Sequence, residues 1–160
     1  MGRMIGGVLL GYIAMAAVVF AGLSLAYFVL GADRVFQPGV YDVSTLWVIT
    51  SFVVGFGAAA AGGWIARRIA RTPTGPRVLA GLVVVLGIAI ALPLLSGSAD
   101  AVVHRTEALG MFDAMQYEQT PLWVALLNPL VGALGVLVGG RALADLAPSD
   151  LDSRFRLGRS

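Results

Sequence analysis

The fold is decided by the stretch FQPGVYDVSTLWV at Phe36–Val48, which nearly recurs as FDAMQYEQTPLWV at Phe112–Val124. At a constant offset of 76 positions, the two stretches match in a Phe, a Tyr, an acidic residue and a closing Leu-Trp-Val. Each stretch leads directly into a long run of apolar residues. This pattern predicts a chain built from two copies of one hairpin that crosses a membrane twice.

Composition places most of the chain in lipid. The 160 residues are 58% hydrophobic and 12% charged, whereas about 25% of the residues of a soluble domain are charged. There is no cysteine, which excludes disulfides, thiolate metal sites and thiol redox chemistry. Every basic residue is Arg rather than Lys, and Ala and Gly are abundant. This usage is typical of GC-rich bacterial coding, so we expect a bacterial protein.

Four apolar stretches are each long enough to cross a membrane. A spanning helix needs roughly 20 apolar residues, with a range of about 17–25, and in lipid the backbone must satisfy its own hydrogen bonds. The sequence therefore predicts an all-α integral membrane protein with four transmembrane helices. The stretches are Ile5–Leu30 with 26 residues, Leu46–Ala66 with 21, Val78–Leu95 with 18 and Leu122–Gly140 with 19.

The arginines predict which way the helices face. Nine Arg residues lie in the N-terminal segment, the second loop and the C-terminal tail, whereas two lie in the first and third loops. Cytoplasmic loops carry the excess of Arg and Lys. We therefore expect a multi-pass protein of the bacterial cytoplasmic (inner) membrane, with both termini and the second loop in the cytoplasm.

We expect one transmembrane domain at residues 1–146, followed by a short cytoplasmic tail at residues 147–160. Within the domain, repeat 1 spans about residues 3–67 and repeat 2 about residues 77–141, as two tandem hairpins that both start inside. Such parallel repeats are related by an axis along the membrane normal. The offset drifts between 74 and 77, so the alignment needs small insertions, one of them near Asn128–Pro129. The alternative is chance similarity, because Gly, Val and Leu match easily.

The ends of the predicted helices carry aromatic and acidic residues. Trp47 and Trp64 flank the second helix and Trp123 opens the fourth. Because Trp is enriched at membrane interfaces, we expect all three to be interfacial anchors. Asp42 and Glu118 precede the second and fourth helices at equivalent repeat positions. A carboxylate there caps free N–H groups and stabilises the helix dipole, which we favour over acid–base chemistry.

Small residues recur every three or four positions along three of the helices. Close backbone approach through small residues supplies the van der Waals contact that drives helix association in lipid. We favour packing within the four-helix bundle, with the second helix at its centre, and the alternative is a surface for a homo-oligomer or a larger membrane partner. These packing residues are Gly7, Gly11, Gly55, Ala59, Gly63, Gly132, Gly135 and Gly139.

Four polar residues are expected in one layer near the outer leaflet, namely Ser24, Thr50, Ser51 and Asn128. One interpretation is a shallow polar binding pocket that opens outward. The interpretation that we favour is local hydrogen bonding, in which the hydroxyls bond to their own helices and Asn128 covers the carbonyl freed by Pro129. Because Pro cannot donate a hydrogen bond, Pro129 also predicts a kink or a widened turn.

The loops contain few groups that indicate chemistry. In the third loop, Ser96–Thr120, the spacing of Leu109, Phe112 and Met115 suits a short helix on the outer surface, and the alternative is a loosely ordered loop. His104 is the only histidine, so we expect no metal site, and no cofactor motif is present. The second loop, Arg67–Arg77, sets topology and is suited to anionic lipid headgroups.

These features favour a non-enzymatic structural or interaction protein. The apolar stretches hold no Asp, Glu, Lys, Arg or His, although proton relays and ion-coupled carriers require an ionisable residue at depth. The expected partners are the lipid bilayer and either a second copy or a larger membrane protein, and the small net charge of +2 gives no reason to expect nucleic acid. The alternative is a small transporter or channel-like protein, with a path between the repeats near Thr50, Ser51 and Asn128. A membrane enzyme that uses loop carboxylates is the least supported class.

Overall fold

The computed structural model describes residues 1–38, 42–95 and 121–142, and these residues are helical apart from short connections. Four of the helices are long and apolar enough to cross a membrane, as the sequence predicts. The predicted surface helix at Ser96–Thr120 and the tail at residues 147–160 lie outside the described residues. The helices are α1 (Gly2–Leu30), α2 (Ala32–Val35), α3 (Thr45–Ala70), α4 (Thr74–Leu95) and α6 (Leu122–Ala142).

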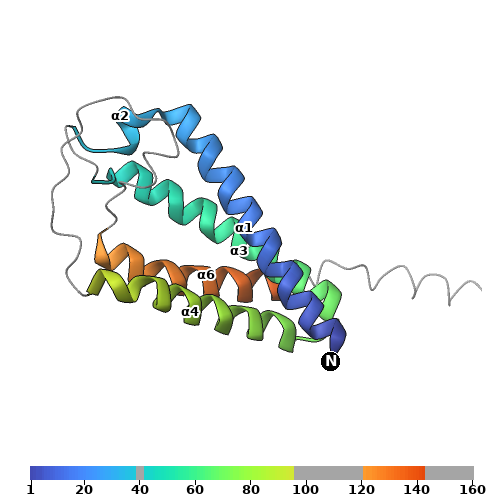
Figure 1. The fold of residues 1–160 in the computed structure, drawn as a ribbon. Helices are drawn as coiled ribbons and strands as arrows, with labels where there is room; N and C mark the ends of the chain where they lie inside the picture. The colour runs from blue at the N-terminus through green and yellow to red at the C-terminus, as the bar shows by residue number, and fades with distance from the viewer. Residues whose placement is uncertain (39–41, 96–120, 143–160) are drawn as a thin grey trace, which may run out of the picture.

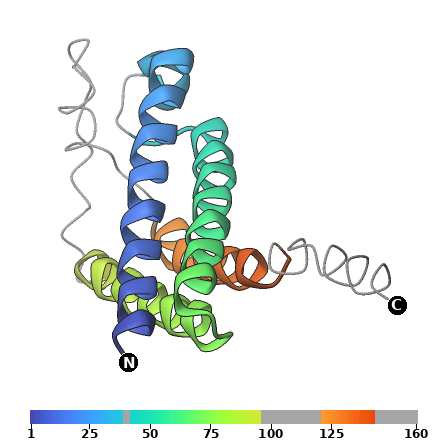
Figure 2. The same ribbon diagram turned by 90° about the vertical axis from the view of Figure 1, so that its right-hand side faces the viewer.

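The four long helices form two antiparallel pairs, α1 with α3 and α4 with α6 (Figure 1). Helix α3 is the central helix, because its contacts with α1 and with α6 are the most extensive between helices and it also packs against α4. The two pairs meet at the end that carries the N-terminus and diverge toward α2, as Figures 1 and 2 show from two directions. Helices α3 and α6 run in the same direction, so their contact is a parallel one.

A buried cluster joins the four long helices at the end where the two pairs meet. Each helix contributes a side chain to it, and five of its six buried members are Ala or Val. Small side chains suit this position because they let helix backbones come close enough for extensive van der Waals contact. The buried members are Val8, Ala59, Ala66, Leu79, Ala80 and Val136.

A second buried cluster lies at the opposite end, beneath α2. The chain leaves α1 at Gly31, whose φ of 73° and ψ of 159° turn it back toward α3. Phe36 then forms an isolated antiparallel bridge with Val43, and both side chains are buried. These residues pack with Val35, Trp47, Val48 and Val124. The cluster caps the α1–α3 pair and includes one residue of α6.

The N-terminal cap of α3 is Ser44 rather than the expected Asp42. The Ser44 Oγ accepts a hydrogen bond from the Trp47 backbone N–H at 3.1 Å and donates one to the Arg34 carbonyl at 2.6 Å. Asp42 instead supplies its backbone carbonyl to the Gln37 N–H at 2.8 Å. The bridge between Phe36 and Val43 places Asp42 two residues before the cap, so a hydroxyl takes the capping role that the sequence assigned to the carboxylate.

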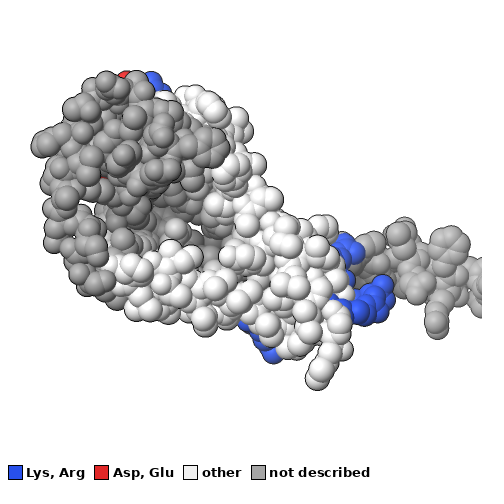
Figure 3. All heavy atoms as spheres, viewed as in Figure 1, with Lys and Arg blue, Asp and Glu red and all other residues white. Residues whose placement is uncertain are grey.

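Charge separates along the molecule, as Figure 3 shows by the uncharged surface between its charged ends. Six of the seven described arginines lie at the end where the two helix pairs meet, and this end is called the Arg-rich end below. Arg34 lies at the α2 end together with Asp33 and Asp42. The four helices thus alternate in direction between a basic end and a mixed end, the pattern that the positive-inside argument requires.

Candidate functional site: helix seams and the polar layer

Helices α1 and α3 pack backbone to backbone through glycine. A Cβ built on Gly11 would lie 2.7 Å from the Gly62 carbonyl oxygen, and one built on Gly62 would lie 2.7 Å from the Gly11 carbonyl oxygen. Gly7 is as tightly placed, since its Cβ would lie 2.9 Å from the Ala66 carbonyl oxygen. Gly7 and Gly11 thus line a contact within the chain, and Gly62 is a partner that the sequence spacing did not single out.

Helices α3 and α6 meet along a second glycine seam, called the α3–α6 seam below. A Cβ built on Gly63 would overlap the Val136 carbonyl, and one built on Gly139 would overlap the Ala60 carbonyl. Gly135 would place its Cβ 2.8 Å from the Ala59 Cβ, and Ala59 is fully buried. Of the predicted packing residues, Ala59, Gly63, Gly135 and Gly139 are therefore brought together here.

The other two predicted packing glycines lie in looser surroundings. A Cβ on Gly132 would approach a Val83 methyl of α4 at 3.1 Å, and one on Gly55 would lie 4.0 Å from Asn128 Oδ1. A tighter contact that the sequence did not reveal joins α4 to α6, where a Cβ on Gly87 would overlap the Pro129 ring. Helix α6 runs through Pro129 as one element, and the Pro129 ring is buried against the bare backbone of Gly87.

The four residues of the predicted polar layer are only partly brought together. The Thr50 hydroxyl donates to the Leu46 carbonyl at 2.8 Å, a bond within its own helix. Ser24 on α1 and Ser51 on α3 are partly buried, and Asn128 on α6 is exposed. Asn128 Oδ1 lies across from Gly55 on α3. The structure thus joins Asn128 to the α3 side but shows no hydrogen bond between the layer's side chains among the described residues.

The three tryptophans occupy three different surroundings. Trp47 is 7% exposed and packs edge-on against Tyr27, with ring centroids 6.4 Å apart. Trp64 is half-buried and lies under the Arg68 guanidinium, 5.3 Å from its ring centroid. Trp123 is 58% exposed. An exposed ring suits an interfacial anchor, whereas Trp47 differs from that expectation because α1 and the α2 cap cover it.

The described residues contain no group of three His, Asp or Glu side chains placed to hold a metal ion. Comparisons with protein-family models, with curated proteins and with solved structures found no match. The fold and the sites therefore define a class: an all-helical protein with four helices long and apolar enough to span a membrane. Function has to be argued from this chain's own surfaces.

Proposed function

We propose that the protein is a non-enzymatic membrane protein that associates with itself or with a larger membrane partner through the outer face of α4. The observation that carries this proposal is Gly81, for which a built Cβ would meet nothing within 4 Å. Glycine in a helix costs about 1 kcal/mol relative to alanine, yet the internal packing does not use this one. An exposed glycine on a spanning helix lets the backbone of a partner helix approach closely.

The neighbours of Gly81 extend this face along the whole helix. Val78, Val85, Ile88 and Leu92 are 43%, 65%, 46% and 55% exposed, and with Gly81 they repeat at alternating spacings of three and four residues. This heptad spacing is typical of a seam between two helices. The five residues are called the α4 face below.

The test is native mass spectrometry after purification in mild detergent. We expect a defined oligomer or complex that Gly81→Leu abolishes while helix content and thermal stability stay unchanged. The matched control is Gly57→Leu, because a Cβ on Gly57 of α3 also meets nothing within 4 Å. A monomer that carries only lipid, or equal loss of association in both variants, would refute the proposal.

We also propose that the chain consists of two repeats, and reciprocal contacts in the α3–α6 seam support this. Gly63 meets the Val136 carbonyl and Gly139 meets the Ala60 carbonyl. At an offset of 76, Gly63 corresponds to Gly139 and Ala60 to Val136, so each contact is the image of the other, as in an isologous two-fold interface. This offset equals that of the two aromatic stretches, without the insertion expected near Asn128–Pro129.

The outer helices of the two repeats do not follow the same offset. Gly7 and Gly81 each lie four residues after the start of their repeat, yet Gly7 packs on α3 whereas Gly81 is open. In the first pair Gly11 faces Gly62, but in the second pair Pro76 faces Gly140. The register of α4 on α6 is therefore shifted by about two turns from the register of α1 on α3. The pseudo-symmetry is restricted to α3 and α6.

The proposed orientation places the Arg-rich end on the cytoplasmic side of a bacterial inner membrane. Because the chain has no cysteine, single cysteines report topology without background. Thr74→Cys at the Arg-rich end and Asp33→Cys in α2 replace exposed residues at opposite ends. We expect an impermeant thiol reagent to label Asp33→Cys in intact cells and Thr74→Cys only after lysis, and the reverse pattern would overturn the orientation.

A transporter or channel-like role is the alternative, and the placement of Asn128 favours it. This side chain lies between the diverging helix pairs, across from Gly55, where a substrate path between repeats would run. If a polar path mattered, Asn128→Leu would abolish transport or ligand binding in a folded protein. Unchanged behaviour of Asn128→Leu would leave the association role as the proposal.

A further inference from the structure

A partly open cavity of about 170 Å³ lies at the Arg-rich end between three helices. Its basic side chains come from the last turn of α3, the first turns of α4 and the last turn of α6. A cavity needs roughly 15 Å³ by this measure to hold one water molecule, so the space admits a polyatomic group. Its walls include Arg67, Arg77, Arg141, Pro73, Pro76 and Gly140.

Glycine and proline hold these walls together. A Cβ on Gly140 would lie 2.6 Å from the Pro76 Cβ, so the Pro76 ring at the start of α4 packs directly on the bare backbone at the end of α6. Gly75 is similarly close to α3, since its Cβ would lie 2.7 Å from the Ala70 Cβ. The three arginines are thus fixed on the ends of packed helices rather than on free loops.

Among the described residues, the charges around the cavity have one sign. The carboxylates of the described residues, Asp33 and Asp42, lie at the α2 end. Arg67 and Arg141 stand at the C-termini of α3 and α6, where a cation stabilises the helix dipole. Stabilisation of a helix dipole does not explain Arg77. This residue stands near the N-terminus of α4, where the dipole is positive and favours an anion.

If the four long helices span a membrane, the cavity lies at the level of the lipid phosphates. Trp64 precedes Arg67 by less than one turn of α3, and Trp side chains sit at the level of the lipid headgroups. Arg binds phosphate with two parallel hydrogen bonds from its planar guanidinium. We propose that this cavity binds a phosphate group, held by Arg67, Arg77 and Arg141 from both halves of the chain. This site goes beyond the proposed association role and does not depend on it.

The test measures lipid binding to the whole protein in detergent by native mass spectrometry. The probes are phosphatidylglycerol, phosphatidylcholine and inorganic phosphate, each added alone. We expect tight binding of phosphatidylglycerol, and a loss of about fivefold in affinity for Arg77→Gln or for Arg141→Gln. Displacement of that lipid by millimolar inorganic phosphate would identify free phosphate as the ligand, and resistance to displacement would identify the lipid headgroup.

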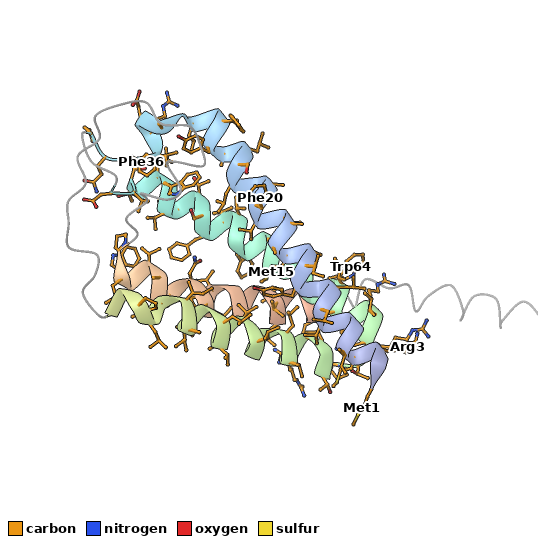
Figure 4. The ribbon with its side chains drawn as sticks, viewed as in Figure 1. Met1, Arg3, Met15, Phe20, Phe36 and Trp64 are labelled. Carbon is orange, nitrogen blue, oxygen red and sulfur yellow. The ribbon has the colours of Figure 1, made fainter. Side chains whose placement is uncertain are left out.

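The matched control is Arg3→Gln, because Arg3 lies at the same end but points away from the four helices (Figure 4). We expect this variant to bind phosphatidylglycerol as the unmodified protein does. Arg77→Lys keeps the charge without the planar guanidinium, so it should lose less affinity than Arg77→Gln. Thermal unfolding of every variant confirms that it is folded. An equal loss in Arg3→Gln, or unchanged phosphatidylglycerol binding in Arg77→Gln and Arg141→Gln, would overturn the site.

Discussion

The α3–α6 seam makes a quantitative prediction for two alanine substitutions, Gly139→Ala and Gly63→Ala. A methyl group on Gly139 would lie 2.6 Å from the Ala60 Cα, whereas ordinary contact begins near 3.4 Å. The obstacle is backbone rather than a side chain that can rotate away. The Ala60 carbonyl oxygen would lie closer still, so the two helices must separate by at least about 0.8 Å, a lower bound estimated from the van der Waals contact range.

This separation sets the size of the effect. An atom pair at its best distance contributes ~0.1–0.2 kcal/mol, and a gap of about 0.5–1 Å forfeits a quarter to a half of it. With on the order of 30 such pairs along the seam, the loss is about 1–2 kcal/mol, within the ~1–3 kcal/mol typical of overpacked cores. The folding equilibrium would shift about 5- to 30-fold.

The assay is unfolding in mixed micelles of mild detergent and dodecyl sulfate, followed by helix content. We expect Gly139→Ala and Gly63→Ala to unfold at a lower dodecyl sulfate fraction, and by similar amounts, because their contacts are reciprocal. The control is Gly57→Ala, which adds a methyl group to open space on α3 and should be neutral or stabilising. Equal unfolding of all three variants would refute the close seam, and a large difference between the first two would refute its two-fold character.

Three further predictions concern the α2 end, each tested by the same unfolding assay. Gly31→Ala should lower the free energy of unfolding by about 1–3 kcal/mol, because a φ of 73° with a ψ of 159° is a conformation that nearly only glycine adopts. The control is Gly6→Ala, since a Cβ on Gly6 meets nothing within 4 Å, and equal stability of the two variants would contradict this prediction. Ser44→Ala should cost about 1 kcal/mol through the lost cap of α3, whereas Asp42→Asn should not, and the opposite order would restore Asp42 as the cap. Trp47 is 7% exposed, so Trp47→Ala should lower the free energy of unfolding by about 3–5 kcal/mol. Trp123 is 58% exposed, so Trp123→Ala should lower it by less than about 1 kcal/mol. Similar losses in the two variants would mean that the two tryptophans share one environment.

Sequence patterning predicted the helices well because lipid imposes a strong constraint on backbone hydrogen bonding. The predicted Leu122–Gly140 and the observed Leu122–Ala142 start at the same residue and end two residues apart. Helix α3 extends four residues past Ala66, through Arg67 and Arg68 to Ala70. Hydropathy ends a span at its first charge, whereas hydrogen bonding continues the helix to the left-handed Arg71, so this boundary could not be predicted from apolar length.

The glycine positions show what spacing can and cannot predict. Four-residue spacing selected Gly7, Gly11, Gly63 and Gly139, which lie at real backbone contacts. It did not select Gly87, whose partner is the Pro129 ring on another helix rather than a small residue. Spacing describes the face of one helix. The pairing of two faces depends on the register between helices, which single-helix periodicity does not contain.

The same limit explains why equivalent residues of the proposed repeats differ at the α2 end. Trp47 and Trp123 correspond at the offset of 76, yet one is buried and the other exposed. Trp47 is covered because α1 extends far enough to bring Tyr27 beside it. Helix α4 meets α6 later, with Gly87 against Pro129, so the described part of the second pair places no such ring beside Trp123. The register of the outer helix, rather than the repeated stretch itself, therefore decides whether that stretch is buried.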